Sequence, residues 1–522
     1  MGQLLGTLAL HPREPTAFAR LPNEMVAKIF EQLCFHCQSP SIFPNADTDD
    51  VRQRKATLAR LCRVSKRFRA IAEPILYHYY ATGNCKHFLD DTDPNIRGTR
   101  WQGSNDYLLS FASRLVERPD LASKVVSMQL VDHSAAYRKY NEDKNLELLR
   151  ALLKQSEDKH WLSCGGLSQT IEGWLSDSDV LDLWKQEAHR WVMCLVMVLS
   201  TNLRNVLIAV DNNYLAFPAF EEKALPIGRL PSLTHLGMMS CRDTPYHLAA
   251  VRGLLASAPK LETIYACDSC HVNVWDSHPQ PHRRHNTGYT PIPCAGLKKL
   301  VICDLFPPHL EEFLWSIDGL EELEYYWKVF PLFRARLNGV LLQTKDTLKR
   351  LCISFLPCHE SQLGPEPHFW YDIVDVKMDR IESLAMFSKL EDIAIDFRSL
   401  RRESDEDEDD LLVNFLPKTA RRLRVSYVVD NMTKSLSKLA NTAPDRFPKL
   451  ESVVIGVTKW PDGISDHVAD MRDEVERLFV NKGISFAWRE DTFGPCVYTL
   501  IPGATKPGLR LLPWKEEDDS AM

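Results

Sequence analysis

A group of cysteine and histidine residues near the middle of the sequence has the types and spacing that could bind a metal ion. Its members are Cys267, Cys270, His271, His278, His282, His285 and Cys294. Zinc favours four Cys or His ligands in a tetrahedral arrangement, and a Cys-x-x-Cys turn places two thiolates on one ion. However, His282 and His285 are closer together than the paired histidines of zinc fingers, and Cys267 falls where a strand should end on a small buried residue. We therefore predict core thiols beside a polar loop, with no metal and no cofactor, and keep a zinc-dependent protein as the alternative.

A second Cys-x-x-Cys pair, Cys34 and Cys37, is a weaker indication of metal binding. It follows a predicted helix, so Cys34 is expected to pack against its neighbours and Cys37 to face water. The sequence has no Gly-x-Ser-x-Gly elbow, phosphate-binding glycine loop, His-Glu-x-x-His motif or dinucleotide fingerprint. Glu321 and Glu322 are expected to form a solvated turn and not an acid/base pair. We therefore predict that the protein is not an enzyme and has no catalytic residues.

The composition is that of an ordinary globular protein and limits the possible partners. The 522 residues are 44% hydrophobic and 25% charged, with a formal net charge of −7. Nucleic acid is disfavoured as a ligand, because its phosphates need a basic surface. The longest apolar run, Trp191–Leu199, is too short to span a bilayer, and residues 4–10 lack the charged leader of a signal peptide. The 14 cysteines are then expected to be reduced, which places the protein in the cytoplasm or nucleus. We expect neither nucleic acid nor a membrane as its partner.

The stretch from Leu21 to Tyr80 has the clearest local pattern. Pro22 suits the first turn of a helix, where its missing N–H costs nothing. The apolar positions that follow at helical spacing are Met25, Val26, Ile29, Phe30 and Leu33. Together they predict a helix with one wide apolar face.

Two further short helices are predicted after a polar insert from Cys34 to Thr57. Leu58 and Leu61 make a short amphipathic turn. Ser65 can cap a third helix, which Pro74 should end near Glu73, because a residue before proline avoids helical geometry. Three short helices in about sixty residues bury too little surface for an independent core, and an exposed apolar face usually marks a partner site. We predict such a site here; the alternative is an ordinary N-terminal cap.

These residues resemble the F-box family. The match is to the opening Leu21-Pro22-x-Glu24-Met25, to the segment Cys62 to Phe68, and to the exit Pro74 to Tyr77. Phe68 stands where the family commonly has Trp, and the insert from Cys34 to Thr57 is longer than usual. Loop-closure entropy grows by only roughly 0.6 kcal/mol per doubling of length, so the insert does not forbid the fold.

The resemblance implies a non-catalytic substrate receptor of an SCF (cullin–RING) ubiquitin ligase. Its partners would be the Skp-type adaptor, through it the cullin and RING subunits, and an unknown target protein. By their place in the family's motif, the residues expected to contact the adaptor are Leu21, Pro22, Met25, Ile29, Phe30, Leu33, Leu58, Leu61, Val64, Phe68 and Leu76. The substrate-binding residues are unknown. The alternative is a repeat scaffold without a role in a ligase.

The rest of the chain repeats one pattern, a Leu-x-x-Leu-x-Leu-type strand core. Its starts are at Val125, Leu203, Leu233, Leu261, Leu297, Leu320, Leu348, Leu390, Ala420 and Leu450. From Leu203 onward, five of the eight spacings are 28 to 30 residues. The pattern resembles leucine-rich repeats, whose units carry one strand and one helix and stack in a row. We predict an α/β (α+β) fold with an irregular leucine-rich-repeat-like solenoid of parallel strands; the alternative is a non-repetitive α/β domain.

The predicted organisation has five parts. They are an N-terminal tail (1–18), the F-box (19–82), a linker (83–105), the repeat domain (106–502) and an acidic tail (503–522). Within the repeat domain, helices are expected at 107–116, 145–154, 176–199, 246–256 and 467–480, with closing strands at 484–488 and 496–501. Tyr325, Tyr326 and Trp327 are candidates for the concave face of the solenoid.

Overall fold

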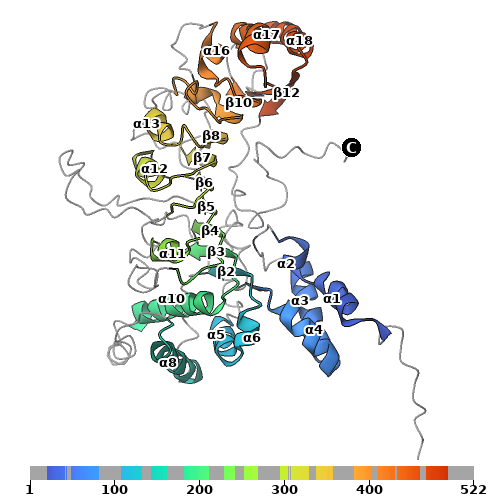
Figure 1. Cartoon of the computed structure of the whole chain (residues 1–522), viewed down its shortest axis with the longest axis vertical. Coiled ribbons are helices and arrows are strands. Elements are labelled where there is room, and N and C mark those ends of the chain that lie inside the picture. Colours follow the sequence, from blue (N-terminus) through green and yellow to red (C-terminus); the bar gives the residue numbers. More distant parts are fainter. Residues whose placement is uncertain are drawn as a thin grey trace, which may run out of the picture.

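A single sheet of twelve parallel strands runs the length of the molecule (Figure 1). The strands lie in the sheet in the order in which they occur in the chain, from β1 to β12, so each inner strand pairs with the one before it and the one after it. The computed structural model describes residues 20–40, 43, 49–81, 107–131, 143–161, 181–210, 228–240, 252–267, 294–303, 305, 307–328, 337–356, 381–400, 409–428, 432–458 and 466–491. The α/β prediction is confirmed, and the units stack in a row as in a solenoid.

Ten of the strands begin two residues after a predicted repeat start. They are β2 (Ser127–Val131), β3 (Asn205–Val210), β4 (His235–Ser240), β5 (Thr263–Cys267), β6 (Lys299–Cys303), β7 (Glu322–Lys328), β8 (Arg350–Leu356), β9 (Asp392–Asp396), β10 (Arg422–Val428) and β11 (Ser452–Thr458). The first residues of adjacent strands are Cα partners, for example Lys299 with Glu322 and Glu322 with Arg350. The repeat pattern in the sequence therefore predicted the strand positions.

Alternation along each strand sends every second side chain into the main hydrophobic core. In β7, Leu323 and Tyr325 are buried in this core, on the face that the helices cover. Tyr325 was predicted to lie on the concave face, but its hydroxyl donates to the Leu305 carbonyl within the core at 2.6 Å. Tyr326 points to the opposite face and donates to Glu324 Oε2 at 3.1 Å. The prediction for Tyr325 was wrong because strand alternation separates adjacent aromatic residues; the Trp327 side chain lies outside the described residues.

Helices between the strands cover the core face. They are α5 (Leu108–Glu117), α6 (Pro119–Ala122), α8 (Asp143–Asp158), α10 (Leu181–Leu199), α11 (Arg252–Ser257), α12 (Pro307–Leu314), α13 (Leu337–Leu342), the 3-10 turn η7 (Phe397–Ser399), α16 (Leu411–Phe415), α17 (Thr433–Arg446) and α18 (Asp466–Val480). At the C-terminal end, α18 packs on β12 (Ser485–Asp491), and the Phe479 and Phe486 rings stack with centroids 4.8 Å apart. The helix predicted at 467–480 and the strand at 484–488 are thus present.

The N-terminal helical module, residues 20–78, has a small core of its own. Its helices are α1 (Asn23–Glu31), α2 (Phe35–Gln38), α3 (Asp49–Leu61) and α4 (Lys66–Leu76). Val26 and Phe30 of α1 pack with Leu58 of α3 and Ile75 of α4. Two predictions need correction: α3 begins inside the predicted polar insert, and α4 continues through Pro74 to Leu76. Proline in the last turn removes one helical hydrogen bond, and burial of Ile75 offsets that loss.

Strand β1 (Tyr79–Ala81) joins this module to the sheet by pairing with β2. Successive residues of a strand point to opposite faces, so Tyr79 enters the module's core and Tyr80 the main core. A second contact joins the module to the sheet: Phe43 packs edge-on against Tyr265 of β5, with ring centroids 5.9 Å apart. The first strand of the sheet, β1, thus lies inside the range predicted for the F-box, 19–82. Figure 1 shows the module on one side of the strands and helices α10 to α13 on the other side.

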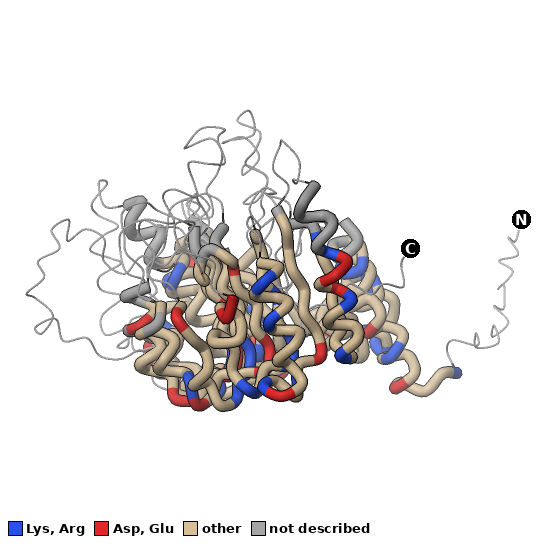
Figure 2. The backbone as a smooth tube through the Cα atoms, turned by 90° about the horizontal axis from the view of Figure 1, so that it is seen from above, with Lys and Arg blue, Asp and Glu red and all other residues tan. Residues whose placement is uncertain are grey.

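Several predicted segments lie outside the described residues. They are the N-terminal tail, the linker at 83–105, the part of the cysteine and histidine group from Cys270 to His285, and the strand at 496–501, together with the acidic tail. Where the structure describes the chain, basic and acidic positions are interspersed along the backbone (Figure 2).

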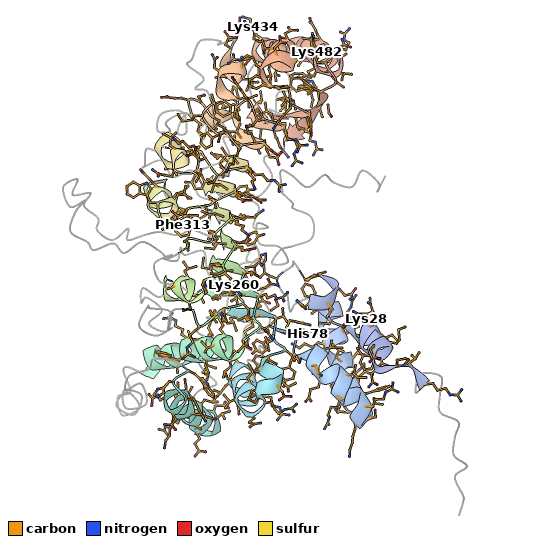
Figure 3. The ribbon with its side chains drawn as sticks, in the orientation of Figure 1. Lys28, His78, Lys260, Phe313, Lys434 and Lys482 are labelled. Atoms are coloured by element: carbon orange, nitrogen blue, oxygen red, sulfur yellow. The ribbon has the colours of Figure 1, made fainter. Side chains whose placement is uncertain are left out.

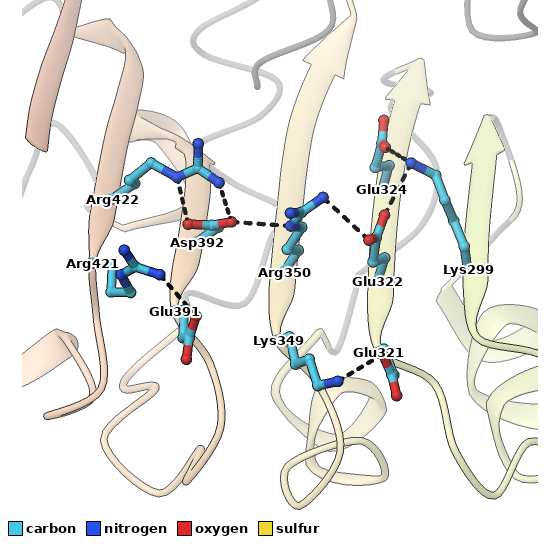
Figure 4. A network of polar contacts seen from close by, with 10 residues as sticks. All are labelled: Lys299, Glu321, Glu322, Glu324, Lys349, Arg350, Glu391, Asp392, Arg421 and Arg422. Carbon is cyan, nitrogen blue, oxygen red and sulfur yellow. Dashed lines mark hydrogen bonds and ion pairs between the residues drawn. The ribbon is translucent and has the colours of Figure 1, made fainter. Parts of the chain in front are cut away.

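Charged side chains form one row across the strands on the face opposite the helices, and a second row at the ends where the strands begin (Figure 4). The first row occupies the first position of five adjacent strands, with alternating sign: Lys299, Glu322, Arg350, Asp392 and Arg422. Arg422 makes a bidentate pair with Asp392 at 2.6 and 2.5 Å, and Arg350 Nε reaches the same carboxylate at 3.0 Å. Glu322, predicted to lie in a solvated turn, is instead the first residue of β7 and pairs with Lys299 at 3.1 Å.

The second row lies one residue earlier and is more exposed. Lys298 pairs with Glu262 at 2.9 Å, Lys349 with Glu321 at 2.8 Å, and Arg421 contacts Glu391 at 3.7 Å. Exposed pairs of this kind contribute little, whereas the Asp392 side chain is only 7% exposed and depends on its two arginines. The first row therefore matters more for stability than the second.

We predict that Asp392→Asn lowers the free energy of unfolding by about 1–3 kcal/mol, because two arginines lose a charged hydrogen-bond partner. The adjacent Glu391→Gln should cost less than about 1 kcal/mol, since it weakens one exposed pair. Urea denaturation of the full chain, followed by circular dichroism, measures both. Equal losses for the two variants would contradict the different roles of the two rows.

Candidate functional site

Large apolar side chains are exposed on the N-terminal helical module although that module has its own core. Met25 is 53% exposed, Ile29 43% and Val64 63%. Met25 and Ile29 are one helical turn apart on α1, so they form a stripe on its outer face. We call Pro22, Met25, Ile29 and Val64 the N-terminal apolar surface.

Helix α1 has two apolar stripes, Met25 with Ile29 and Val26 with Phe30, which differ in their exposure to solvent. Val26 and Phe30 follow Met25 and Ile29 by one residue each, and a step of one residue turns the helix by about 100°. Val26 and Phe30 are buried in the module's core, while Met25 and Ile29 are left outside it. The wide apolar face predicted from the sequence is thus divided into a packed half and an exposed half.

Arg67 fixes the start of α1 against the first turn of α4. Its Nε donates to Asn23 Oδ1 at 2.8 Å, and its guanidinium also donates to the Leu21 carbonyl. Ser65 caps α4, as predicted, by accepting a hydrogen bond from the Phe68 N–H at 3.1 Å. These contacts hold Val64 at the same end of the module as Pro22.

The residues expected to contact the adaptor divide into three groups by exposure. Pro22, Met25, Ile29 and Val64 are exposed; Leu21, Leu33, Leu61, Phe68 and Leu76 are half-buried; Phe30 and Leu58 are buried. Phe30 lies edge-on to Phe68 with ring centroids 5.5 Å apart. Phe30 and Leu58 therefore lie in the module's core beneath the surface, and the adaptor contacts of all eleven residues stay a prediction.

A second cluster brings together Cys34, His36, Cys37 and His78. Their ligand atoms all lie within 4.8 Å of one another. His78 Nδ1 is 3.2 Å from Cys37 Sγ and 3.9 Å from Cys34 Sγ. Cys34 is buried, as predicted, but Cys37 is half-buried and faces His78, which corrects the prediction that it faces water.

The close contacts in this cluster shift the pKa values of three of its side chains. A hydrogen bond from Cys37 lowers the pKa of the Cys34 thiol, and the same contact raises the pKa of Cys37. Burial lowers the pKa of His36, which favours its neutral imidazole. The opposite shifts of the two cysteine pKa values follow from the direct contact between the two sulfur atoms.

The sequence analysis did not include the two histidines of this cluster. His36 lies inside the Cys34–Cys37 pair, and this Cys-x-His-Cys spacing was a usable signal. His78 is 41 residues beyond Cys37 and follows α4, which packs against α1. No periodicity in the sequence indicates that contact.

The group around Cys267 to Cys294 can be described only at its two ends. Cys267 is the last residue of β5, while Cys270 and the histidines of the group lie outside the described residues. Cys294 is buried in the main hydrophobic core, and burial raises its pKa to about 12. A protonated thiol among aliphatic side chains agrees with the predicted core role for Cys294.

Comparisons with known proteins add no relative. No family model matches the chain, and no match was found among curated proteins or solved structures. Among the described helices, none is long and apolar enough to cross a membrane.

We predict that Phe30→Ala and Ile29→Ala, one residue apart, affect stability very differently. Phe30→Ala leaves a cavity in the module's core and should cost about 3–5 kcal/mol. Ile29→Ala removes exposed surface and should cost less than about 1 kcal/mol. Urea denaturation of the two full-length variants provides the comparison. A large loss for Ile29→Ala would show that this side chain is packed and not available to a partner.

Proposed function

We propose that this chain is a non-catalytic substrate receptor of an SCF-type ubiquitin ligase, with the N-terminal helical module as an F-box that docks on the Skp-type adaptor. The observation that carries the proposal is the exposure of Met25, Ile29 and Val64 on a module whose own core is complete without them. They fall at positions of the F-box-like motif to which the family resemblance assigns adaptor contacts.

Physical reasoning supports an external partner for this surface. The module already packs on the rest of the chain through β1 and Phe43, on other faces. Exposed apolar side chains one helical turn apart, as Met25 and Ile29 are, indicate a binding site more often than isolated ones do. In protein interfaces, a few such apolar anchors contribute most of the binding energy.

The repeat region would bind the target protein. Leucine-rich-repeat identity is supported by the strand starts, by their sequential parallel order and by the helices between the strands, of which α10 to α13 lie on one side of the sheet (Figure 1). The module is held firmly to this region: Glu73 of α4 contacts Arg118 at 3.7 Å, and Tyr80 stacks on Phe111 at 4.1 Å. A rigid connection would hold a bound target at a fixed place relative to the ligase, which is catalysis by proximity. Such a role places the protein in the cytoplasm or nucleus.

We predict that the double variant Met25→Asp with Ile29→Asp loses co-purification with the Skp-type adaptor while the chain stays folded. Two carboxylates in an apolar interface would have to be desolvated without a partner, which costs several kcal/mol and lowers affinity by about tenfold or more. The matched control is Met386→Asp, since Met386 is also exposed, at 56%, but lies between β8 and β9. Co-expression with the adaptor and affinity purification measure the effect.

Two results would change the proposal. Unchanged adaptor binding by the Met25/Ile29 variant, or none by the wild-type chain, would refute adaptor docking through this surface. Adaptor binding without cullin in the purified complex would favour the scaffold alternative over a ligase subunit.

A further inference from the structure

The cluster of Cys34, His36, Cys37 and His78 lies where the N-terminal helices meet the sheet. Figure 3 shows His78 at this junction, between the helices of the module and the first strands. The His78 carbonyl accepts hydrogen bonds from Val126 N at 2.9 Å and from Ser127 N at 3.1 Å, so β2 holds its backbone. Cys34 is the N-cap residue of α2, and His36 and Cys37 lie within this helix.

We propose that Cys34, His36, Cys37 and His78 bind one zinc ion in a structural, tetrahedral site. Zn–S bonds of about 2.3 Å and Zn–N bonds of about 2.05 Å place the S and N ligands of a tetrahedral site about 3.6 Å apart. The two distances from His78 Nδ1 to the cysteine sulfurs, 3.2 and 3.9 Å, lie on either side of that value. The four ligand atoms as a set lie within 4.8 Å of one another, so side-chain movements that draw them closer would admit the ion.

His36 provides an independent reason to expect a ligand. Its Nδ1 is buried and has no hydrogen-bond partner among the described residues. Buried polar atoms in folded proteins are nearly always paired, because an unpaired one costs free energy. Coordination of this ring nitrogen would satisfy it within the cluster.

The donor set selects the metal. Two thiolates and two imidazoles in a tetrahedron suit zinc, whereas magnesium and calcium require oxygen ligands. Two thiolates also neutralise the charge of the ion, which suits a site at the edge of a hydrophobic core. Four protein ligands leave no open position for water or substrate, so the site would be structural and not catalytic.

Zinc at this position would connect the two ends of the helical module. The residues between Cys37 and His78 include α3, α4 and Val64, so one ion would close the loop that carries part of the N-terminal apolar surface. Closing a loop restricts the unfolded chain, and metal binding then adds to folding stability. The proposal is independent of the adaptor, because the ligands and the ion involve this chain alone.

The test measures zinc in the full-length protein, purified under reducing conditions, by elemental mass spectrometry. Wild type is expected to contain one zinc ion per chain, and Cys37→Ser and His78→Asn to lose it by about tenfold or more. Cys62→Ser, a half-buried cysteine of the same module outside the cluster, is the matched control and should keep the ion. Cys270→Ser should also keep it, which separates this site from the Cys267–Cys294 group.

Two further measurements keep the test decisive if a variant fails to fold. His78→Cys supplies another zinc ligand and should retain the ion where His78→Asn loses it. Cobalt added to the metal-free wild type should give tetrahedral d–d absorption and thiolate charge-transfer bands.

Three outcomes would overturn the proposal. The first is wild-type protein without zinc that also fails to bind added zinc or cobalt. The second is zinc that persists unchanged in Cys37→Ser. The third is a Cys34–Cys37 disulfide in protein isolated without oxidant, which would indicate a redox pair instead of a metal site.

Discussion

The in-register stacking of aliphatic side chains along the parallel strands is the interaction on which the rest of the structure depends. Each unit presents one apolar face that only the next unit can cover, and Leu300, Leu323, Leu351 and Ile393 show the result as a continuous buried row. The backbone groups of each strand are satisfied by the same neighbours. Stability is therefore shared between adjacent units and not concentrated in one centre.

The surfaces of the molecule follow from this row. Once one face of the sheet is covered by helices, charged residues at the strand starts fall side by side on the other face and pair with alternating sign. The N-terminal helical module attaches to the same sheet, because Tyr79 and Tyr80 in one short strand belong to two cores. The position of the N-terminal apolar surface is thus determined by strand pairing, and the proposed zinc site would reinforce that connection.

Sequence alone predicted those features that depend on local periodicity. The strand starts from Val125 to Leu450 were found because leucines recur at fixed offsets, and the Ser65 cap because a hydroxyl precedes an apolar run. Features that depend on contacts between distant residues were missed or wrong. Tyr325 was placed on the wrong face, and α4 extends past Pro74 because tertiary packing of Ile75 outweighs one lost hydrogen bond. The contact of His78 with Cys37 depends on helix packing, which no spacing encodes.

The terminal position of β1 has a practical consequence for how the repeat region can be studied. A strand at the end of a sheet leaves backbone groups along one edge without a strand partner. Because β1 is only three residues long, it offers few such groups for another chain to pair with. Deleting residues 1–82 to isolate the repeats would uncover the five-residue edge of β2 and the main-core pocket that Tyr80 fills. The shortened chain would be prone to pair edge to edge and aggregate, so loss of a binding partner could reflect misfolding. Point substitutions on the intact chain avoid this ambiguity.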